Sequence, residues 1–211
     1  MINILLCCEG SADIKVMQVF IRSLSFATNI CFVEKSRGDI KQVTLLGTKY
    51  SKHSTASRKL AQLAKTVNCR HIAYHQDEDN KGLNYIQEKV KSIFSLSSAK
   101  GMSCIAIVPQ RMTESWLLSD VTAFEKTFGS KPNNPELPSK PEETWGNKGA
   151  EEHPKTIMAN VLAQYRAEVS PEIFGVIAEN TDIDVLTQRC PKSFGQFRTD
   201  MQTFITEGVA A

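Results

Sequence analysis

The feature that most constrains the fold of this chain is a regular alternation of short apolar runs with longer amphipathic segments. The apolar runs cover residues 2–8, 30–33, 69–75 and 104–108, and segments with helical periodicity lie between them at 12–27, 54–67 and 83–96. Runs that are apolar throughout are typical of strands buried on both faces, and strands that alternate with helices form parallel βαβ units. The sequence therefore predicts an α/β fold with a mostly parallel sheet of about four strands, flanked by helices.

The rest of the chain is expected to be helical or irregular. Residues 35–50 are polar and basic and predict a loop or a hairpin, and residues 129–154 are rich in proline and predict a long irregular loop. Helices are expected at 112–118, 121–128, 156–167, 171–179, 182–188 and 193–206. We therefore expect three parts: an α/β core over residues 1–128, the proline-rich loop over 129–154, and a helical extension over 155–211 packed on the core.

Composition narrows the class of protein further. The formal net charge is +2 and the six cysteines form no C-x-x-C pair, which favours free thiols over a disulfide scaffold or a zinc site. The apolar run at residues 2–8 lacks a basic leader and is too short to cross a membrane. We expect a cytoplasmic protein with no membrane partner.

Acidic side chains follow three of the predicted strands. Glu9 follows the first strand, Asp77 and Asp79 follow the third, and Glu114 opens the helix after the fourth. Because the carboxyl ends of parallel strands meet at one edge of a sheet, these acids should converge there. Carboxylates are hard oxygen ligands suited to Mg²⁺ or Mn²⁺, so the four acids are candidate metal ligands.

Each acid also has a purely structural explanation. A D-x-D pair in a loop is commonly a solvated turn, and an acid in the first turn of a helix offsets the helix dipole, which applies to Glu9 and to Glu114. The joint placement after three different strands is what favours a metal site.

Other side chains could assist these acids. His75 precedes Asp77 by two residues and should point the same way if the strand continues, as a metal ligand, a general base or a hydrogen-bonded strand-end histidine. Lys155, or alternatively Arg111, could meet a phosphate, and either could equally be a surface cation. Trp145 could stack a base or contact a partner.

A basic segment supports nucleic acid as a partner. Residues 35–59 carry seven lysines and arginines, against the acids Glu34 and Asp39, and could follow a phosphate backbone or form a solvated polar surface. The chain has no Walker A motif, no G-x-G-x-x-G after the first strand, no G-x-S-x-G and no H-E-x-x-H. These absences argue against a P-loop ATPase, a dinucleotide site, a serine hydrolase and a zinc protease.

Several short motifs resemble a known family. An acid-glycine pair after the first strand and D-x-D after the third resemble the TOPRIM domain of primases, type II topoisomerases and OLD-type nucleases. A bacterial TOPRIM-like family of unknown function is similar over about residues 1–205, in the motifs CEG at 8–10, HQDED at 75–79, VP at 108–109, ESWLLSD at 114–120, HPK at 153–155 and CPKSFGQF at 190–197.

The resemblance implies a TOPRIM-like core in which Glu9, Asp77 and Asp79 bind the metal, with Glu114 as a further ligand. It also implies an ABC- or SMC-like ATPase partner encoded in anti-phage loci. No topoisomerase or primase activity is implied, since no tyrosine-bearing cleavage domain or zinc-binding module is recognised.

Two functions are consistent with these features, with a third given less weight. The first is a nuclease dependent on Mg²⁺ or Mn²⁺ in anti-phage defence, with Lys155 neutralising developing charge and His75 orienting the acids or moving a proton. The second is a TOPRIM-like subunit without catalysis that binds an ATPase or a phage protein. The third is a phosphohydrolase acting on small molecules.

Overall fold

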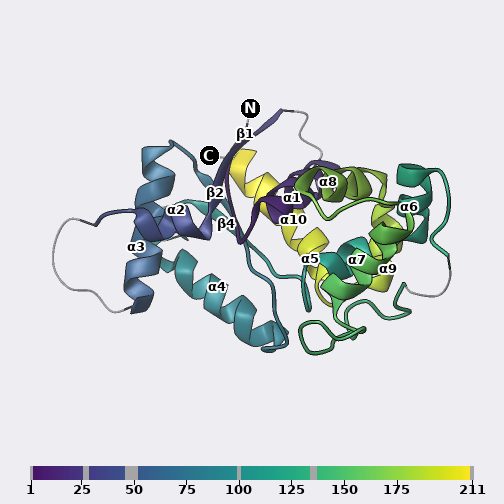
Figure 1. The fold of residues 1–211 in the computed structure, drawn as a ribbon. Coiled ribbons are helices and arrows are strands. Elements are labelled where there is room, and N and C mark those ends of the chain that lie inside the picture. Colours follow the sequence, from purple (N-terminus) through teal and green to yellow (C-terminus); the bar gives the residue numbers. More distant parts are fainter. Residues whose placement is uncertain (1, 26–28, 46–51, 99–100, 134–136, 210–211) are drawn as a thin grey trace.

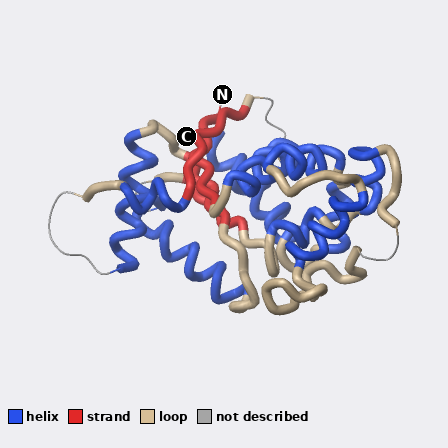
Figure 2. The backbone as a smooth tube through the Cα atoms, in the orientation of Figure 1, coloured by secondary structure: helices blue, strands red, loops and turns tan. Residues whose placement is uncertain are grey.

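A computed structural model describes residues 2–25, 29–45, 52–98, 101–133 and 137–209. Four parallel strands form one sheet in the order β2-β1-β3-β4, which Figure 2 shows as a narrow central band between helices. The strands are β1 (Ile2–Cys8), β2 (Ile30–Ser36), β3 (His71–His75) and β4 (Ser103–Ile107). The predicted α/β class with a four-stranded sheet flanked by helices is confirmed, and the sheet is parallel throughout.

Except for α2, the helices lie where the sequence predicts helical segments. They are α1 (Ser11–Leu24), α2 (Arg37–Gln42), α3 (Lys52–Thr66), α4 (Leu83–Ser98), α5 (Thr113–Leu117), α6 (Val121–Phe128), α7 (Pro154–Gln164), α8 (Pro171–Asn180), α9 (Ile183–Arg189) and α10 (Phe194–Val209).

Alternate residues of β1 face two separate hydrophobic cores. Ile4, Leu6 and Cys8 pack with α1 and the later helices, whereas Leu5 and Cys7 pack with α3 and α4. This follows from the two-residue period of a strand, and it explains why the whole run is apolar. Figure 1 shows α2, α3 and α4 on one side of the sheet and α1, α5 to α10 on the other.

The strand order creates a switch point between β1 and β3. The chain leaves β1 toward β2 on one side and then crosses to β3 on the other side of β1. Right-handed crossovers then place α1 and the α3–α4 pair on opposite faces of the sheet. Ligands of open parallel sheets bind at the carboxyl ends of the strands next to such a point.

Two irregular segments differ in how well the sequence predicted them. Within the predicted loop 35–50, residues 37–42 form α2, because Ser36 and Asp39 make a reciprocal capping box at its start. Residues 46–51 of the basic segment lie outside the described residues. In the predicted loop 129–154, the described residues before Pro154 form turns and bends without a helix or strand.

The C-terminal helices share one core with the sheet. Trp116 of α5 is fully buried, and its ring packs against Phe20 of α1 and against Phe194 and Phe197 of α10. The helical C-terminus is confirmed, and it contributes to the core on the α1 face of the sheet. The boundaries proposed for the three parts remain a prediction.

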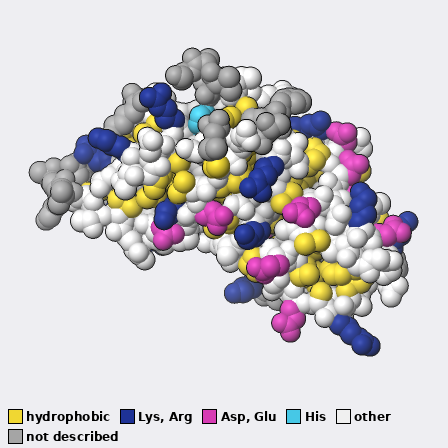
Figure 3. Space-filling model, turned by 90° about the horizontal axis from the view of Figure 1, so that it is seen from above, with side chains coloured by type: hydrophobic (Ala, Val, Ile, Leu, Met, Phe, Trp, Pro, Cys, Tyr) yellow, Lys and Arg dark blue, Asp and Glu magenta, His cyan; other side chains and the backbone are white. Residues whose placement is uncertain are grey.

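All six cysteines are free, as the sequence predicts. Burial raises the pKa of Cys7 to about 12, so this thiol is not a nucleophile near neutral pH. Among the described helices, none is long and apolar enough to span a membrane. On the face near the N terminus, acidic and basic side chains are interspersed (Figure 3), consistent with a small net charge.

Candidate functional site

Three side chains converge where β1 and β3 end. Asp13, His75 and Asp77 each offer a ligand atom, and these atoms lie within 4.8 Å of one another. His75 is the last residue of β3 and Asp13 lies in the first turn of α1, directly after β1. The three groups therefore meet at the switch point of the sheet, where parallel folds bind ligands.

The strand pairing continues past β3 and fixes the direction of Asp77. The amide of Gln76 donates to the carbonyl oxygen of Ile107 at 3.0 Å. His75 and Asp77 consequently point the same way, with His75 Nε2 3.3 Å from Asp77 Oδ1. The expectation that these two side chains share a face is confirmed.

The hydroxyl of Thr113 lies among the three groups. It donates to Asp13 Oδ1 at 2.8 Å, and its oxygen is 3.0 Å from His75 Nε2 and 3.3 Å from Asp77 Oδ1. The Thr113 amide also donates to Asp77 Oδ1 at 3.0 Å. The start of α5 is thus bonded to the ends of β1 and β3.

Both carboxylate oxygens of Asp13 accept a hydrogen bond. Its Oδ2 accepts the amide of Gly10, the residue before α1, at 3.0 Å, while Oδ1 accepts the Thr113 hydroxyl. A carboxylate in the first turn of a helix is also favoured by the helix dipole. Local capping chemistry therefore fixes Asp13 toward the sheet edge.

His75 is fully buried among these acids. Its Nδ1 has no hydrogen-bond partner among the described residues, so the ring is held through Nε2 alone. Burial acts to lower the pKa of His75, but the charge of Asp13 and the hydrogen bond and charge of Asp77 outweigh it and raise the pKa. A proton on His75 offsets part of the negative charge of the cluster.

The carboxyl group of Glu114 also has a shifted pKa, as His75 does. It is 8 % exposed, and burial followed by the charge of Asp77 raises its pKa to about 7, although Lys155 acts in the opposite direction. A carboxyl group with such a pKa can release or accept a proton near neutral pH. Perturbed groups of this kind concentrate at functional sites.

Glu9 is engaged by a cation of the chain itself. Its carboxylate forms an ion pair with Arg37 Nη1, and Arg37 Nη2 donates to Gln76 Oε1 at 2.6 Å. Arg37 is the first residue of α2, so this contact links the ends of β1, β2 and β3. Glu9 lies at the expected edge, but among the described residues it does not belong to the three-member group of potential ligands.

Asp79 departs from the expected geometry. An extended D-x-D would place Asp77 and Asp79 on one face, but Asp79 adopts a left-handed conformation with φ 52°. Its carboxylate contacts Lys81 Nζ at 3.0 Å.

The intervening Glu78 explains this turn. Glu78 is 2 % exposed and accepts the amides of Asn80 at 3.1 Å, Gly82 at 2.5 Å and Arg111 at 3.1 Å. The middle residue of the motif is therefore structural: it binds the loop after β3 to the loop after β4.

The remaining predicted residues lie around this edge. Lys155 is exposed in the first turn of α7, and its charge acts on Glu114. The guanidinium of Arg111 lies over the Trp145 ring, 5.9 Å from its centroid, and Trp145 lies 5.0 Å from the His153 ring. Trp145 thus joins the proline-rich loop to the edge of the site.

The donor set of the cluster fits a divalent cation. One imidazole nitrogen and two carboxylate oxygens are ligands that Mn²⁺ and related cations accept, and Glu114 lies close enough for Asp77 and Asp13 to raise its pKa. The Thr113 hydroxyl occupies the middle of the group, so a cation would have to displace it or bind it as well.

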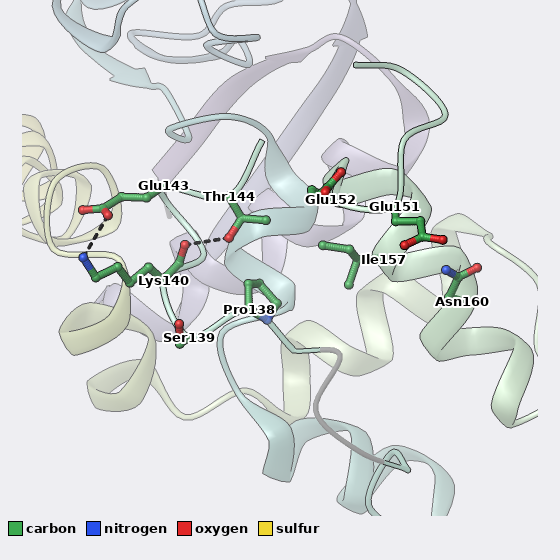
Figure 4. Close-up of a pocket in the computed structure, with 9 residues that line it drawn as sticks. All are labelled: Pro138, Ser139, Lys140, Glu143, Thr144, Glu151, Glu152, Ile157 and Asn160. Atoms are coloured by element: carbon green, nitrogen blue, oxygen red, sulfur yellow. Dashed lines mark hydrogen bonds and ion pairs between the residues drawn. The ribbon is translucent and has the colours of Figure 1, made fainter. Parts of the chain in front are cut away.

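A separate pocket lies away from this cluster. It has a volume of about 680 Å³ and is formed by the proline-rich loop and α7 (Figure 4). Lys140 and Glu143 form an ion pair at 3.0 Å on one side of it, and Glu151 and Glu152 lie on the other. None of the predicted site residues lines it.

Sequence reasoning missed Asp13, Thr113 and Arg37. Asp13 could have been found as the first-turn acid of the helix after β1, the same signal that identified Glu114 after β4. Arg37 could not, because the short helix that carries it was expected to be a loop.

Comparison of the chain with family models, with curated proteins and with solved structures finds no match.

Proposed function

We propose that this protein is a metal-dependent nuclease that hydrolyses phosphodiester bonds, with a TOPRIM-like core. The observation that carries the proposal is the convergence of Asp13, His75 and Asp77 at the switch point of a parallel sheet, with ligand atoms within 4.8 Å of one another. The proposed metal ligands therefore differ from those expected from sequence: Asp77 is kept, Asp13 and His75 join it, and Glu114 is an additional ligand or a proton-transfer group.

A bound Mg²⁺ or Mn²⁺ would supply Lewis-acid stabilisation of phosphoryl charge and would lower the pKa of water at the site. Asp13, Asp77 and a neutral His75 would hold the cation. Because His75 carries a raised pKa, it must lose its proton before Nε2 can become a ligand.

The chain's own groups suit the rest of the chemistry. Glu114, with a pKa of about 7, can hold a proton for the leaving oxygen or take one from water. Lys155 is exposed beside Glu114 and can neutralise a phosphate oxygen, a contribution of a few kcal/mol in preorganised sites. Arg37 stays paired with Glu9 and shapes the edge next to Asp77.

The biological setting follows from the family resemblance alone. An ABC- or SMC-like ATPase partner, a role in anti-phage defence and a cytoplasmic location remain predictions. The alternative, a subunit that binds such a partner without catalysis, remains a prediction as well.

The test is a cleavage assay on labelled single-stranded and duplex DNA and RNA, with Mg²⁺, Mn²⁺ or EDTA. We expect cleavage with a divalent cation that is reduced by at least about a hundredfold in Asp77→Asn and Asp13→Asn. Lys65→Gln, which changes an exposed lysine of α3, is the control and should cleave like the natural protein.

Two results would contradict the nuclease. One is no cleavage of any of these substrates under all metal conditions. The other is cleavage that is equal in the natural protein and both aspartate variants. If variants that lack both aspartates still capture an ATPase, and no nucleic acid is cleaved, the alternative of a binding subunit without catalysis is favoured.

A further inference from the structure

A polar groove runs beside the candidate site, on the β4 side of the sheet. It has a volume of about 520 Å³ and lies between the start of α4, the residue after Pro109 and the start of α10. Its lining consists of one aromatic ring, four side-chain amides, one lysine and two further residues: Tyr85, Asn84, Gln87, Gln110, Gln196, Lys192, Gly82 and Leu83.

The groove shares its edge with the loops that carry the site. The Gly82 amide donates to Glu78 Oε1 at 2.5 Å, and the carbonyl oxygen of Arg111, next to Gln110, accepts the amide of Asp79 at 2.9 Å. The groove and the Asp77 cluster are therefore parts of one sheet edge.

Tyr85 is the most unusual member of the groove. At 63 % exposure, it is the most exposed large hydrophobic side chain among the residues the structure describes. A single exposed ring is common on protein surfaces, but this one lines the same groove as four amide side chains. Nucleobases stack on such rings whatever their sequence, because every base has a π-face.

The amides supply the second kind of contact. Asparagine and glutamine both donate and accept hydrogen bonds, so they match the edges of unpaired bases. Gln110 Oε1 is buried and has no hydrogen-bond partner among the described residues, so the Gln110 side chain would have to turn toward the groove to accept a hydrogen bond from a base. Duplex nucleic acid hides these base edges, so the pattern favours single strands.

Lys192 supplies a charge for the phosphate backbone. Its side chain is 58 % exposed and its Nζ is 3.6 Å from a carboxylate oxygen of Glu143. An exposed pair of this kind contributes little, so a phosphate can replace Glu143 as the partner.

From this combination we infer that the groove binds single-stranded nucleic acid and leads it to the Asp77 cluster. The choice of ligand rests on the proposed nuclease function, whereas the groove itself rests on Tyr85, the four amides and Lys192.

The experiment measures binding without cleavage. Fluorescein-labelled oligo(dT) and oligo(rU) of about twelve nucleotides, and a hairpin duplex, are titrated with the full chain in EDTA and followed by fluorescence anisotropy. We expect the single strands to bind more tightly than the duplex, and Tyr85→Ala to weaken their binding by about tenfold. Tyr85→Phe keeps the ring and should bind like the natural protein.

A salt titration tests the lysine separately. Lys192→Gln should reduce the slope of log K against log salt by about 0.7, the value for one phosphate contact of a single strand. Lys65→Gln is the matched control, because the end of α3 precedes β3 and lies at the opposite edge of the sheet. It should leave the slope unchanged.

Crosslinking locates the strand directly. An oligonucleotide containing 5-iodouracil is irradiated with the natural protein, and tryptic peptides are mapped. Crosslinks to residues 82–89, 101–111 or 193–198, which contain Tyr85, Gln110 and Gln196, support the groove.

The inference is overturned if Tyr85→Ala binds like Tyr85→Phe, if crosslinks fall only outside these peptides, or if a neutral oligosaccharide displaces the strand. Binding through Tyr85 without cleavage under any metal condition would uphold the groove and remove the nuclease. Cleavage that depends on Asp77 but not on Tyr85 would uphold the nuclease and remove the groove.

Discussion

Arg37 forms an ion pair with Glu9 at the end of β1. The guanidinium also donates to Gln76, the residue before Asp77, at 2.6 Å. The negative charge of Glu9 is therefore already balanced by the chain, whereas Asp13 and Asp77 accept hydrogen bonds from backbone amides and lie next to the Thr113 hydroxyl and the buried His75. This difference favours the ligand set Asp13, His75 and Asp77 over the set with Glu9 that the sequence predicted.

The first prediction compares these ligand sets through cation affinity. Asp13→Asn should weaken Mn²⁺ binding by about tenfold or more, because it removes a charged ligand from the cluster. Glu9→Gln should change the affinity by less than about threefold, since Arg37 already neutralises Glu9. Isothermal titration calorimetry at pH 7.5 measures both, and a larger loss in Glu9→Gln would restore Glu9 as a ligand.

The second prediction concerns pH and stability without metal. The pKa of Glu114 is about 7 in the folded protein, above the ordinary glutamate value of 4.5, so the folded state binds the proton more tightly. The stabilisation from this proton is fully present below pH 4.5 and is lost as the pH rises through 7, by up to about 3 kcal/mol. The raised pKa of His75 acts in the same direction, with stability lost as the pH rises above its folded value.

Glu114→Gln isolates the contribution of Glu114 to the pH dependence of stability. This variant cannot ionise, so its free energy of unfolding should fall less than that of the natural protein between pH 5 and pH 8. Urea unfolding in EDTA at both pH values provides the comparison, with Glu125→Gln, a change to a half-exposed residue of α6, as the control. Parallel pH profiles for Glu114→Gln and the natural protein would show that Glu114 ionises normally.

The sequence predicted the sheet and most helices because their signals are local. The apolar run from Ile2 to Cys8 indicated a strand buried on both faces, and the structure divides it between two cores. The position of Asp77 and its shared face with His75 also followed from strand periodicity.

The details of the site depended on contacts that no local pattern encodes. Glu78 turns the chain at Asp79 through a bond to the distant Arg111 amide, so the D-x-D pair is not extended. Asp13 and Thr113 are a hundred residues apart, and only the meeting of α1 and α5 brings them together. Arg37 was expected only as part of the basic segment, and its pairing with Glu9 could not be predicted because α2 depends on a capping box within a polar segment.

The third prediction tests the hydroxyl at the centre of the cluster. Thr113→Val keeps the shape of the side chain but leaves Asp13 Oδ1 and His75 Nε2 without their hydroxyl partner. We expect a loss of about 1–3 kcal/mol in the free energy of unfolding in EDTA. Thr113→Ser retains the hydroxyl and should lose less, and saturating Mn²⁺ should recover part of the loss in Thr113→Val if a cation replaces the hydroxyl.

One result would contradict the role of the Thr113 hydroxyl. Equal stability of Thr113→Val and the natural protein in EDTA would show that the hydroxyl does not hold the three groups together.

The last prediction concerns a buried acid in the proline-rich loop. Glu142 is 3 % exposed and accepts the amides of Lys192 and Ser193 at 3.0 and 2.7 Å and the Ser193 hydroxyl at 2.6 Å. The indole of Trp116 donates to that hydroxyl at 2.8 Å. One loop carboxylate thus binds the start of α10 to α5, the helix that carries Thr113 and Glu114.

Glu142→Gln keeps the size of the side chain but removes its charge and one acceptor. We expect a loss of about 1–3 kcal/mol, and a melting temperature lower by about 2–4 °C for each kcal/mol. Glu143→Gln is the matched control, because the neighbouring carboxylate is exposed and its pairs with Lys140 and Lys192 lie at the surface, so its effect should stay within about 0.5 kcal/mol.

Trp116 reports the local effect of Glu142→Gln. In a Trp145→Phe background only Trp116 remains of the two tryptophans, and its emission should shift to shorter wavelength when its buried indole N–H loses the ordered Ser193 hydroxyl as acceptor. If Glu142→Gln has the same melting temperature as Glu143→Gln and the Trp116 emission is unchanged, the proline-rich loop does not hold α10 against α5. The position of Glu114 would then depend on the hydrogen bonds of Thr113 and on the aromatic packing of Trp116.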